Sequence, residues 1–180
     1  MSDKIIKVID KEFEIFIPFK EIDNAIQGVA NQINKDYKNK KPLFVVILNG
    51  AFMFAADLFK KLTIECEVSF VKLSSYQGTK TTEKVKKIIG LNESIQGRQV
   101  IIVEDIIDTG ITMEHLLKEL QAMKPHDIRL ATLLFKPEAF RKDFKIHYIG
   151  MDIPNDFILG YGLDYDGFAR NLPDIYKLIK

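Results

Sequence analysis

The stretch that decides the fold is Val100–Thr112, which reads VIIVEDIIDTGIT. It opens on aliphatic residues without a polar face, which is typical of a strand in a parallel sheet covered by helices on both sides. Glu104 and Asp105 follow at the expected carboxyl end of that strand, where open α/β sheets bind their ligands. A turn through Gly110 then leads into a helix expected over Ile111–Met123. The stretch therefore predicts a strand, a ligand-binding turn and a helix in direct succession.

Similar units lie on both sides of this stretch. The segment AFMFAADLFKKL, residues 51–62, has the spacing of a helix, and Lys124-Pro125 ends the later one. Further strands are expected over four ranges: Leu43–Leu48, Ile64–Leu73, Asp127–Phe135 and Ile146–Gly150. Strands that alternate with helices in this way predict an α/β fold with an open, twisted, mostly parallel sheet flanked by helices.

The chain length favours a single domain. Its 180 residues, 47% of them hydrophobic, suffice for one sizeable core. We expect one domain over residues 1–180, with its core over about residues 36–150. The aromatic segment FEIFIPF near the N-terminus and the tail from Pro154 onward read as extended, so residues 1–18 and 151–180 are expected to form a small hood over one edge of the sheet.

One polar segment interrupts the pattern of strands and helices. Ser74–Lys87 is rich in Thr and Lys and lies between two strand-like runs. Its composition fits a long exposed hairpin and a mobile flap equally well, and both interpretations stay open.

Charge and cysteine content exclude several functional classes. The net charge is +1, from 26 basic and 25 acidic residues, so nothing in the balance calls for nucleic acid or an anionic membrane. Cys66 is the only cysteine, and the alternation around it predicts burial in a strand. The N-terminus lacks a secretion signal, and no apolar run approaches the ~18 residues of a membrane span. We therefore expect a cytoplasmic protein. Zinc is not expected, because the three histidines lack ligand-like spacing: His115, His126 and His147.

The acidic turn has the chemistry of a sugar-phosphate site. Small residues at a helix start leave backbone N–H groups pointing outward with the positive end of the helix dipole behind them, which suits a phosphate. The hydroxyls of Thr109 and Thr112 would add donors, while Glu104 and Asp105 would accept hydrogen bonds from a pair of sugar hydroxyls. In the competing interpretation, Asp108 or Thr109 simply caps the helix and the other acids are solvated.

The whole stretch resembles the phosphoribosyl-diphosphate motif of the type I phosphoribosyltransferases. Its form Glu-Asp-Ile-Ile-Asp-Thr-Gly is similar to that of the hypoxanthine-guanine branch. The resemblance implies that Glu104 and Asp105 hold the ribose hydroxyls and that Asp108 is the base that takes a proton near purine N7. It also implies a 5′-phosphate site made by five residues: Asp108, Thr109, Gly110, Ile111 and Thr112.

Two earlier segments resemble the parts of that family that hold diphosphate. Val46–Phe54, VILNGAFMF, is similar to the diphosphate loop, which implies that Asn49 and Gly50 bind the leaving group through backbone amides. The family usually has Lys before this Gly, so the ammonium is missing here. Lys72–Thr79 resembles the start of the flexible catalytic loop, which would fold two side chains over the diphosphate: Ser75 and Tyr76. By composition alone these segments would be a turn and a solvated hairpin.

Two later segments resemble the purine site of the family. Lys136, in LLFKPEAF, matches the Lys that donates a hydrogen bond to the purine 6-oxo group. Asp152–Tyr176 matches a motif in which an aromatic ring stacks on the purine, a backbone reads the ring edge, an Asp binds a water of magnesium, and an Arg contacts diphosphate. The matching residues are Phe157, Ile158, Asp164 and Arg170. On the residues alone, Lys136 could be a solvated strand end, Phe157 a core residue and Asp164 part of an acidic turn.

The resemblance implies an enzyme of purine salvage. It would convert hypoxanthine, and also guanine, with 5-phosphoribosyl 1-diphosphate into the nucleoside monophosphate and diphosphate. It also implies a homodimer or homotetramer, and Mg²⁺ held near Glu104, Asp105 and Asp164. Two alternatives remain open: a non-catalytic regulatory protein of the same fold that binds phosphoribosyl diphosphate, and an unrelated α/β protein that binds a sugar phosphate.

Overall fold

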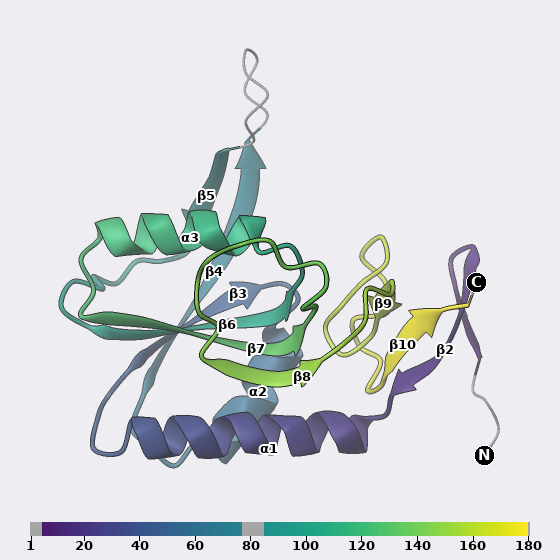
Figure 1. Ribbon diagram of the computed structural model, residues 1–180, viewed down its shortest axis with the longest axis horizontal. Coiled ribbons are helices and arrows are strands. Elements are labelled where there is room, and N and C mark those ends of the chain that lie inside the picture. The colour runs from purple at the N-terminus through teal and green to yellow at the C-terminus, as the bar shows by residue number, and fades with distance from the viewer. Residues whose placement is uncertain (1–4, 77–84, 180) are drawn as a thin grey trace.

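A six-stranded sheet organises the core (Figure 1). The computed structural model describes residues 5–76 and 85–179. The strand order is β5-β4-β3-β6-β7-β8, and all neighbours are parallel except the antiparallel pair β4–β5. The predicted open, mostly parallel sheet is thereby confirmed. Its strands are β3 (Leu43–Leu48), β4 (Glu67–Tyr76), β5 (Val85–Ile89), β6 (Gln99–Ile107), β7 (Asp127–Phe135) and β8 (Tyr148–Asp152).

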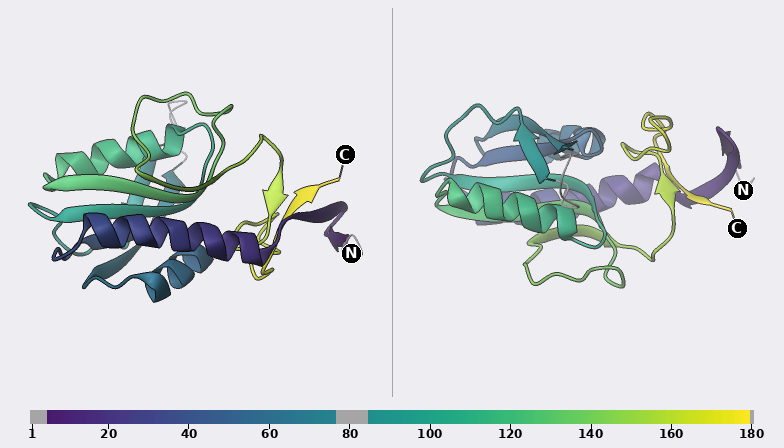
Figure 2. Two further views of the ribbon diagram at one scale, coloured as in Figure 1. Left: turned by 60° about the horizontal axis from the view of Figure 1, so that its bottom comes forward. Right: turned by 90° about the horizontal axis from the view of Figure 1, so that it is seen from above.

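Helices cover both faces of this sheet. Helices α1 (Phe19–Asp36) and α2 (Phe52–Lys61) lie on one face, and α3 (Ile111–Ala122) lies on the other (Figures 1 and 2). Strand β6 serves both layers, because Ile101 and Val103 pack in the core beneath α1 and α2 while Ile102 packs beneath α3. Its aliphatic run has no polar face for this reason. None of the helices in the described part of the chain is long and apolar enough to cross a membrane.

The two chain ends form a second sheet, as expected for the hood. Its order is β1-β2-β10-β9, and every pairing is antiparallel. The N-terminal and C-terminal segments therefore lie side by side at one end of the molecule (Figure 2). We call this the hood sheet. Its strands are β1 (Ile6–Val8), β2 (Lys11–Ile17), β9 (Ile158–Leu159) and β10 (Ile175–Leu178).

The sequence analysis did not predict helix α1, because it placed the start of the core at about residue 36. Its buried residues Ile22, Ile26, Val29 and Ile33 recur at helical spacing, with polar residues between them. The helix begins at Phe19, directly after Pro18, although FEIFIPF reads as wholly extended in the sequence. The amphipathic spacing was the available signal.

Several element boundaries differ from expectation. Strand β4 begins at Glu67 rather than Ile64, so the expected burial of Cys66 in a strand is wrong. Cys66 is half-buried just before the strand, and burial raises the pKa of its thiol. Strand β6 continues past Val103 to Ile107, because it keeps pairing with β7. Its Glu104 and Asp105 therefore lie within the strand rather than after it.

The polar segment Ser74–Lys87 runs from the end of β4 into β5. These strands pair antiparallel, Ser74 opposite Lys87, which agrees with a hairpin. Residues 77–84 lie outside the described residues, so the flap interpretation is left open there.

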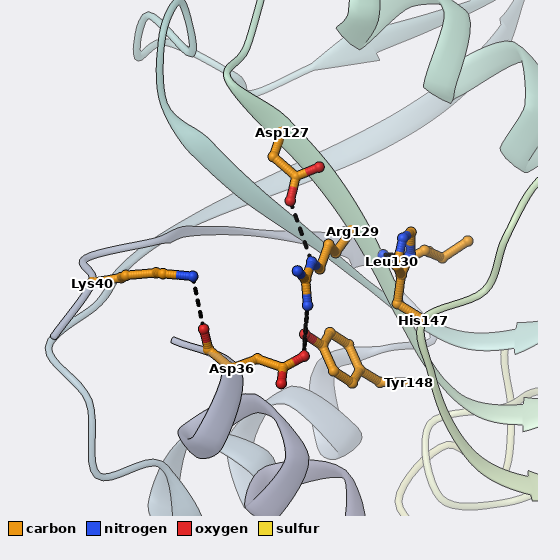
Figure 3. Close-up of polar contacts among 7 residues, drawn as sticks. All are labelled: Asp36, Lys40, Asp127, Arg129, Leu130, His147 and Tyr148. Atoms are coloured by element: carbon orange, nitrogen blue, oxygen red, sulfur yellow. Dashed lines mark hydrogen bonds and ion pairs between the residues drawn. The ribbon is translucent and has the colours of Figure 1, made fainter. Parts of the chain in front are cut away.

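A polar cluster fastens the end of α1 to the sheet (Figure 3). The Asp36 carboxylate accepts hydrogen bonds from Arg129 Nη1 at 2.6 Å and from the Tyr148 hydroxyl at 2.9 Å. Arg129 also pairs with Asp127 through Nε at 3.2 Å. The Tyr148 hydrogen bond, followed by Arg129, holds the pKa of Asp36 below its ordinary value. Burial is the main cause that raises the pKa of Tyr148 to about 12.

We predict that Asp36→Ala lowers the free energy of unfolding by about 1 kcal/mol at pH 7, because the pair is partly exposed and screened. The folded-state pKa of Asp36 lies below the ordinary 3.8, so this contribution is complete above that pH and disappears as the pH falls through the lowered pKa. Urea denaturation at pH 7 and pH 2.5 measures both values. Asp143→Ala, at an exposed position, is the control. A difference that stays constant with pH would contradict the prediction.

Candidate active site

The turn between β6 and α3 forms a cradle at the carboxyl edge of the sheet. Gly110 is the N-cap of α3, and its φ of 80° is a left-handed conformation that glycine adopts without strain. A Cβ at this position would lie 2.6 Å from the Phe140 ring. The backbone conformation and the lack of space beside the ring therefore both favour glycine. No side chain caps α3 at Gly110. The capping interpretation of Asp108 and Thr109 is therefore not supported, since the Ile111 N to Thr109 Oγ1 separation is a marginal 3.5 Å.

A small cavity opens at this cradle. Its volume is about 130 Å³, and its walls bring together the strand end and the first turn of the helix. The N-terminal amides of α3, with the positive end of the helix dipole, lie at its edge. Such a site is suited to an anion with the volume of a phosphate group. The lining residues are Glu104, Ile106, Ile107, Asp108, Thr109, Gly110, Thr112 and Met113.

The adjacent carboxylates Glu104 and Asp105 lie in different surroundings. Neighbouring strand residues point to opposite faces of a sheet. Glu104 lines the cavity beside α3, whereas Asp105 lies against Gly50, at which a Cβ would be 1.6 Å from Asp105 Oδ2. Asp105 Oδ1 accepts a hydrogen bond from Ile106 N at 2.8 Å. The loop at Asn49, which follows a cis peptide bond after Leu48, is thereby held next to β6.

Lys136 is buried at the end of β7, only 7% exposed. Its ammonium donates to the Asp156 carbonyl oxygen at 2.9 Å, to Asn155 Oδ1 at 3.3 Å and to Asp108 Oδ2 at 3.4 Å. The alternative that Lys136 is a solvated strand end is therefore wrong. The contact with Asp108, whose side chain is 48% exposed, places a cation and a carboxylate together at the rim of the cradle.

Phe157 is 46% exposed, so the alternative of a core residue is wrong. Its ring lies 5.8 Å from the Tyr165 ring in an edge-on arrangement and 6.2 Å from the Phe13 ring. Tyr165 is held in turn by its hydroxyl, which donates to Asp10 at 2.8 Å, and by the Lys11 ammonium, 4.8 Å from its ring centre. Neighbours from the hood sheet thus fix an aromatic ring that remains open to a planar ligand.

The loop after β9 faces the Asn49-Gly50 loop. Asp164 pairs with Arg170 at 2.5 Å, and Arg170 Nη1 donates to the Gly162 carbonyl at 2.7 Å. Gly162 has a φ of 96°, and a Cβ there would lie 2.1 Å from the Gly50 carbonyl oxygen. A second cavity of about 420 Å³ opens between the two loops. It is lined by Leu48, Asn49, Phe52, Gly167, Phe168, Ala169, Arg170 and Asn171.

Asp164 is also part of a local turn, because its Oδ2 accepts a hydrogen bond from Gly167 N at 2.7 Å. Asp164 therefore does belong to an acidic turn, as the alternative interpretation expected. Its other carboxylate oxygen, Oδ1, pairs with Arg170. Ile158 is 7% exposed and lies in β9 opposite Lys177.

Residues 18–166 match the family described as the phosphoribosyl transferase domain. The chain belongs to the phosphoribosyltransferase family. The hypoxanthine-guanine phosphoribosyltransferase of Staphylococcus aureus is 38% identical over 166 residues, which cover 92% of this chain and 93% of that protein. The hypoxanthine phosphoribosyltransferase of Buchnera aphidicola is 40% identical over 169 residues, covering 92% and 96%. A solved hypoxanthine phosphoribosyltransferase structure from Staphylococcus aureus has a TM-score of 0.85 at 37% identity, covering 92% of this chain and 91% of that one.

Within this phosphoribosyltransferase, most residues singled out in the sequence lie around one edge of the core. At the cradle, Asp108 contacts Lys136. Gly50 lies between Asp105 on one side and the loop that carries Arg170 on the other. Two residues are not placed: Ser75 and Tyr76 end β4, and their side chains lie outside the described part of the chain.

Sequence reasoning missed the neighbours of these residues. Asn155 and Asp156 hold Lys136 although they lie 19 and 20 positions away in the chain. Phe13 comes from the opposite end of the chain to Phe157. The local sequence gives no signal for such contacts, because these residues are far apart in the chain and come together only in the folded structure.

Gly50 lies against the Asp105 carboxylate, and we predict that Gly50→Ala lowers the free energy of unfolding by about 1–3 kcal/mol. The new Cβ would force the Asp105 carboxylate out of its place and away from Ile106 N. Gly28→Ala is the matched control, since nothing lies within 4 Å of a Cβ there and alanine favours a helix interior. Urea denaturation measures both variants. Equal midpoints for Gly50→Ala and the wild type would contradict the prediction.

Proposed function

We propose that this protein is a purine salvage transferase, which joins hypoxanthine, and also guanine, to the ribose of 5-phosphoribosyl 1-diphosphate. The products are the nucleoside monophosphate and diphosphate. The observation that carries the proposal is the meeting of Asp108, Lys136 and the α3 cradle at one edge of the sheet. The names of the relatives from Staphylococcus aureus and Buchnera aphidicola support the same activity.

The cradle would bind the 5′-phosphate. The five residues from Asp108 to Thr112 surround the N-terminus of α3, where backbone amides and the helix dipole favour a doubly charged anion. Glu104 lines the same cavity and Asp105 lies across the strand beside Gly50. Both are assigned to the ribose hydroxyls, because carboxylates accept hydrogen bonds without donating any.

The purine would lie between Phe157 and Lys136. Phe157 presents an exposed ring on which a flat base can stack, and the backbone of the adjoining Ile158 would read the ring edge. The Lys136 ammonium donates only, so it suits the 6-oxo group of hypoxanthine and guanine and is unsuited to the 6-amino group of adenine. Asp164, which pairs with Arg170, is also assigned to the purine site.

The chemical step replaces one bond at C1 of the ribose by another. The bond from C1 to the diphosphate oxygen breaks, the diphosphate leaves with the electron pair, and a purine nitrogen donates its lone pair to C1 through an oxocarbenium-like state. The purine then carries one extra proton, which has to be removed. Asp108 is assigned to accept it near N7, because its half-exposed carboxylate lies beside the ammonium that would hold the 6-oxo group.

The leaving diphosphate would be held by the loops on either side of the second cavity. Asn49 and Gly50 would offer backbone amides and Arg170 its guanidinium, with Ser75 and Tyr76 covering the site. Asn49 replaces the Lys usual in the family, so this chain supplies less positive charge from that loop.

The carboxylates of Glu104, Asp105 and Asp164 fit a magnesium site of the kind that substrates complete. The described residues contain no group of three His, Cys, Asp or Glu side chains placed to hold a metal, and Mg²⁺ at phosphates uses only one or two carboxylates with substrate oxygens. Glu104 and Asp105 would hold the ion together with the diphosphate and the ribose, and Asp164 would bind one of its waters. Mg²⁺ supplies neutralisation of the charge that develops on the leaving group.

The whole chain would act as a single domain, residues 1–180, with the hood sheet completing the purine site. We place it in the cytoplasm, as a homodimer or homotetramer that needs neither nucleic acid nor membrane. The near-neutral charge supports this setting.

A screen of free bases tests the proposed function. Purified protein is incubated with phosphoribosyl diphosphate, Mg²⁺ and one base at a time, and released diphosphate is measured. Release is expected with hypoxanthine and guanine, and none with adenine or pyrimidines. A regulatory protein that only binds phosphoribosyl diphosphate, or an unrelated sugar-phosphate protein, would release none with any base, and that result would reject the proposal.

We predict that Asp108→Asn lowers kcat by about 10²–10⁴-fold, because the amide cannot accept the purine proton. The affinity for phosphoribosyl diphosphate should change little, since the cradle amides belong to the backbone. Steady-state kinetics gives the first value and calorimetry the second. An unchanged kcat would exclude Asp108 as the base, and a large loss of affinity would assign it to binding instead.

A further inference from the structure

Lys136 has as many hydrogen-bond partners as its ammonium has donors. A lysine ammonium carries three N–H groups and accepts none. In this protein the Lys136 ammonium donates its three hydrogen bonds to the Asp156 carbonyl oxygen, Asn155 Oδ1 and Asp108 Oδ2. A purine oxygen would be a fourth acceptor. It can bind Lys136 only by taking the place of one of the three.

The three contacts differ in how readily they can be given up. Asp156 provides a backbone carbonyl at 2.9 Å, the shortest of the contacts, in a segment fixed by the Leu178 N to Phe157 O hydrogen bond of 3.0 Å. Asp108 is the most distant at 3.4 Å and lines the cradle cavity in which the substrate would lie. Asn155 is also an exposed residue, but it is not among the residues that line that cavity. The exchange therefore falls on Asp108.

Asn155 remains as the second anchor, at 3.3 Å. Its side-chain oxygen accepts one N–H of the ammonium on the side of the Asp156 carbonyl. Lys136 is buried, and a buried ammonium that loses an acceptor must turn to another one. With only the Asp156 carbonyl left, the ammonium would be free to swing toward Asp108 and away from the base.

We propose that Asn155 is a positioning residue: with the Asp156 carbonyl oxygen it holds Lys136 so that the N–H now given to Asp108 passes to the 6-oxo oxygen of the bound purine. The exchange frees Asp108 from the ammonium at the moment when it faces the purine proton. The Lys136 ammonium thus links recognition of the purine to the release of Asp108 as proton acceptor. This inference rests on the proposed function.

The test compares the wild type with Asn155→Leu, which keeps the size of the side chain and removes the acceptor. We expect KM for hypoxanthine to rise about tenfold and KM for phosphoribosyl diphosphate to change less than about twofold. Asn155→Asp keeps an oxygen at the same place and should restore KM for hypoxanthine to within about threefold of the wild type. Asn24→Leu, at an exposed position of α1, is the matched control.

A binding measurement separates this inference from the proposed function. Calorimetry with IMP and AMP needs no turnover, and Asn155→Leu should lose about tenfold in affinity for IMP and little for AMP. If the wild type shows neither turnover nor preference for IMP, the proposed function fails and the inference fails with it. If the wild type shows both and Asn155→Leu matches it, only the inference fails.

A purely structural role for Asn155 would also overturn the inference. It would lower the melting temperature of Asn155→Leu and raise both KM values alike, and Asn155→Asp would not restore them. If the leucine side chain disturbs the loop, Asn155→Ala removes the same acceptor without added bulk, and the same pattern of KM and binding values is required of it.

Discussion

The left-handed turn at Gly110 is the constraint on which the site depends. Strand β6 has to stop pairing and α3 has to start within a few residues, with the helix amides facing the edge of the sheet. A φ of 80° allows this reversal, and the Phe140 ring closes the space where any other residue would place its Cβ. Because the cradle consists of backbone, its geometry is set by the fold itself, and the side chains of Glu104 and Asp108 only line it.

Close contacts at two glycines and a hydrogen bond from the buried Tyr161 are among the contacts that join the hood to the core. Gly162 approaches the Gly50 carbonyl and Gly50 approaches Asp105, so the loop after β9, the Asn49-Gly50 loop and β6 are in contact. The Tyr161 hydroxyl, on a residue 1% exposed, donates to Asp57 Oδ2 at 2.6 Å on α2. Burial, with Asp57 next, raises the pKa of Tyr161, so the tyrosine stays a donor throughout the physiological range. These contacts set where the hood presents its residues to the core.

The sequence predicted elements well where one physical signal dominates. The ranges of β3 and β7 agree in full with expectation, because β3 is an unbroken aliphatic run and β7 lies between Pro125 and Pro137. The end of β6 was misplaced because Glu104 and Asp105 look like the end of a strand, although Glu104 still pairs with Thr132. The partners of Lys136 were beyond reach, since no local pattern encodes contacts that the hood and the core make only after folding.

Four of the charged residues assigned to the substrate form two ion pairs with one another. Lys136 contacts Asp108 and Arg170 contacts Asp164, and each pair joins a cation and a carboxylate that would touch the purine or the diphosphate. An unpaired ion in a partly buried site costs several kcal/mol, so mutual pairing keeps the site stable without a ligand's charges. In both pairs the carboxylate is the more exposed partner, 48% for Asp108 and 30% for Asp164, and water can solvate it when the cation turns to a new acceptor. Under the proposed function, substrate binding would exchange one set of ion pairs for another, and discrimination would depend on how well the incoming oxygen atoms replace the carboxylates.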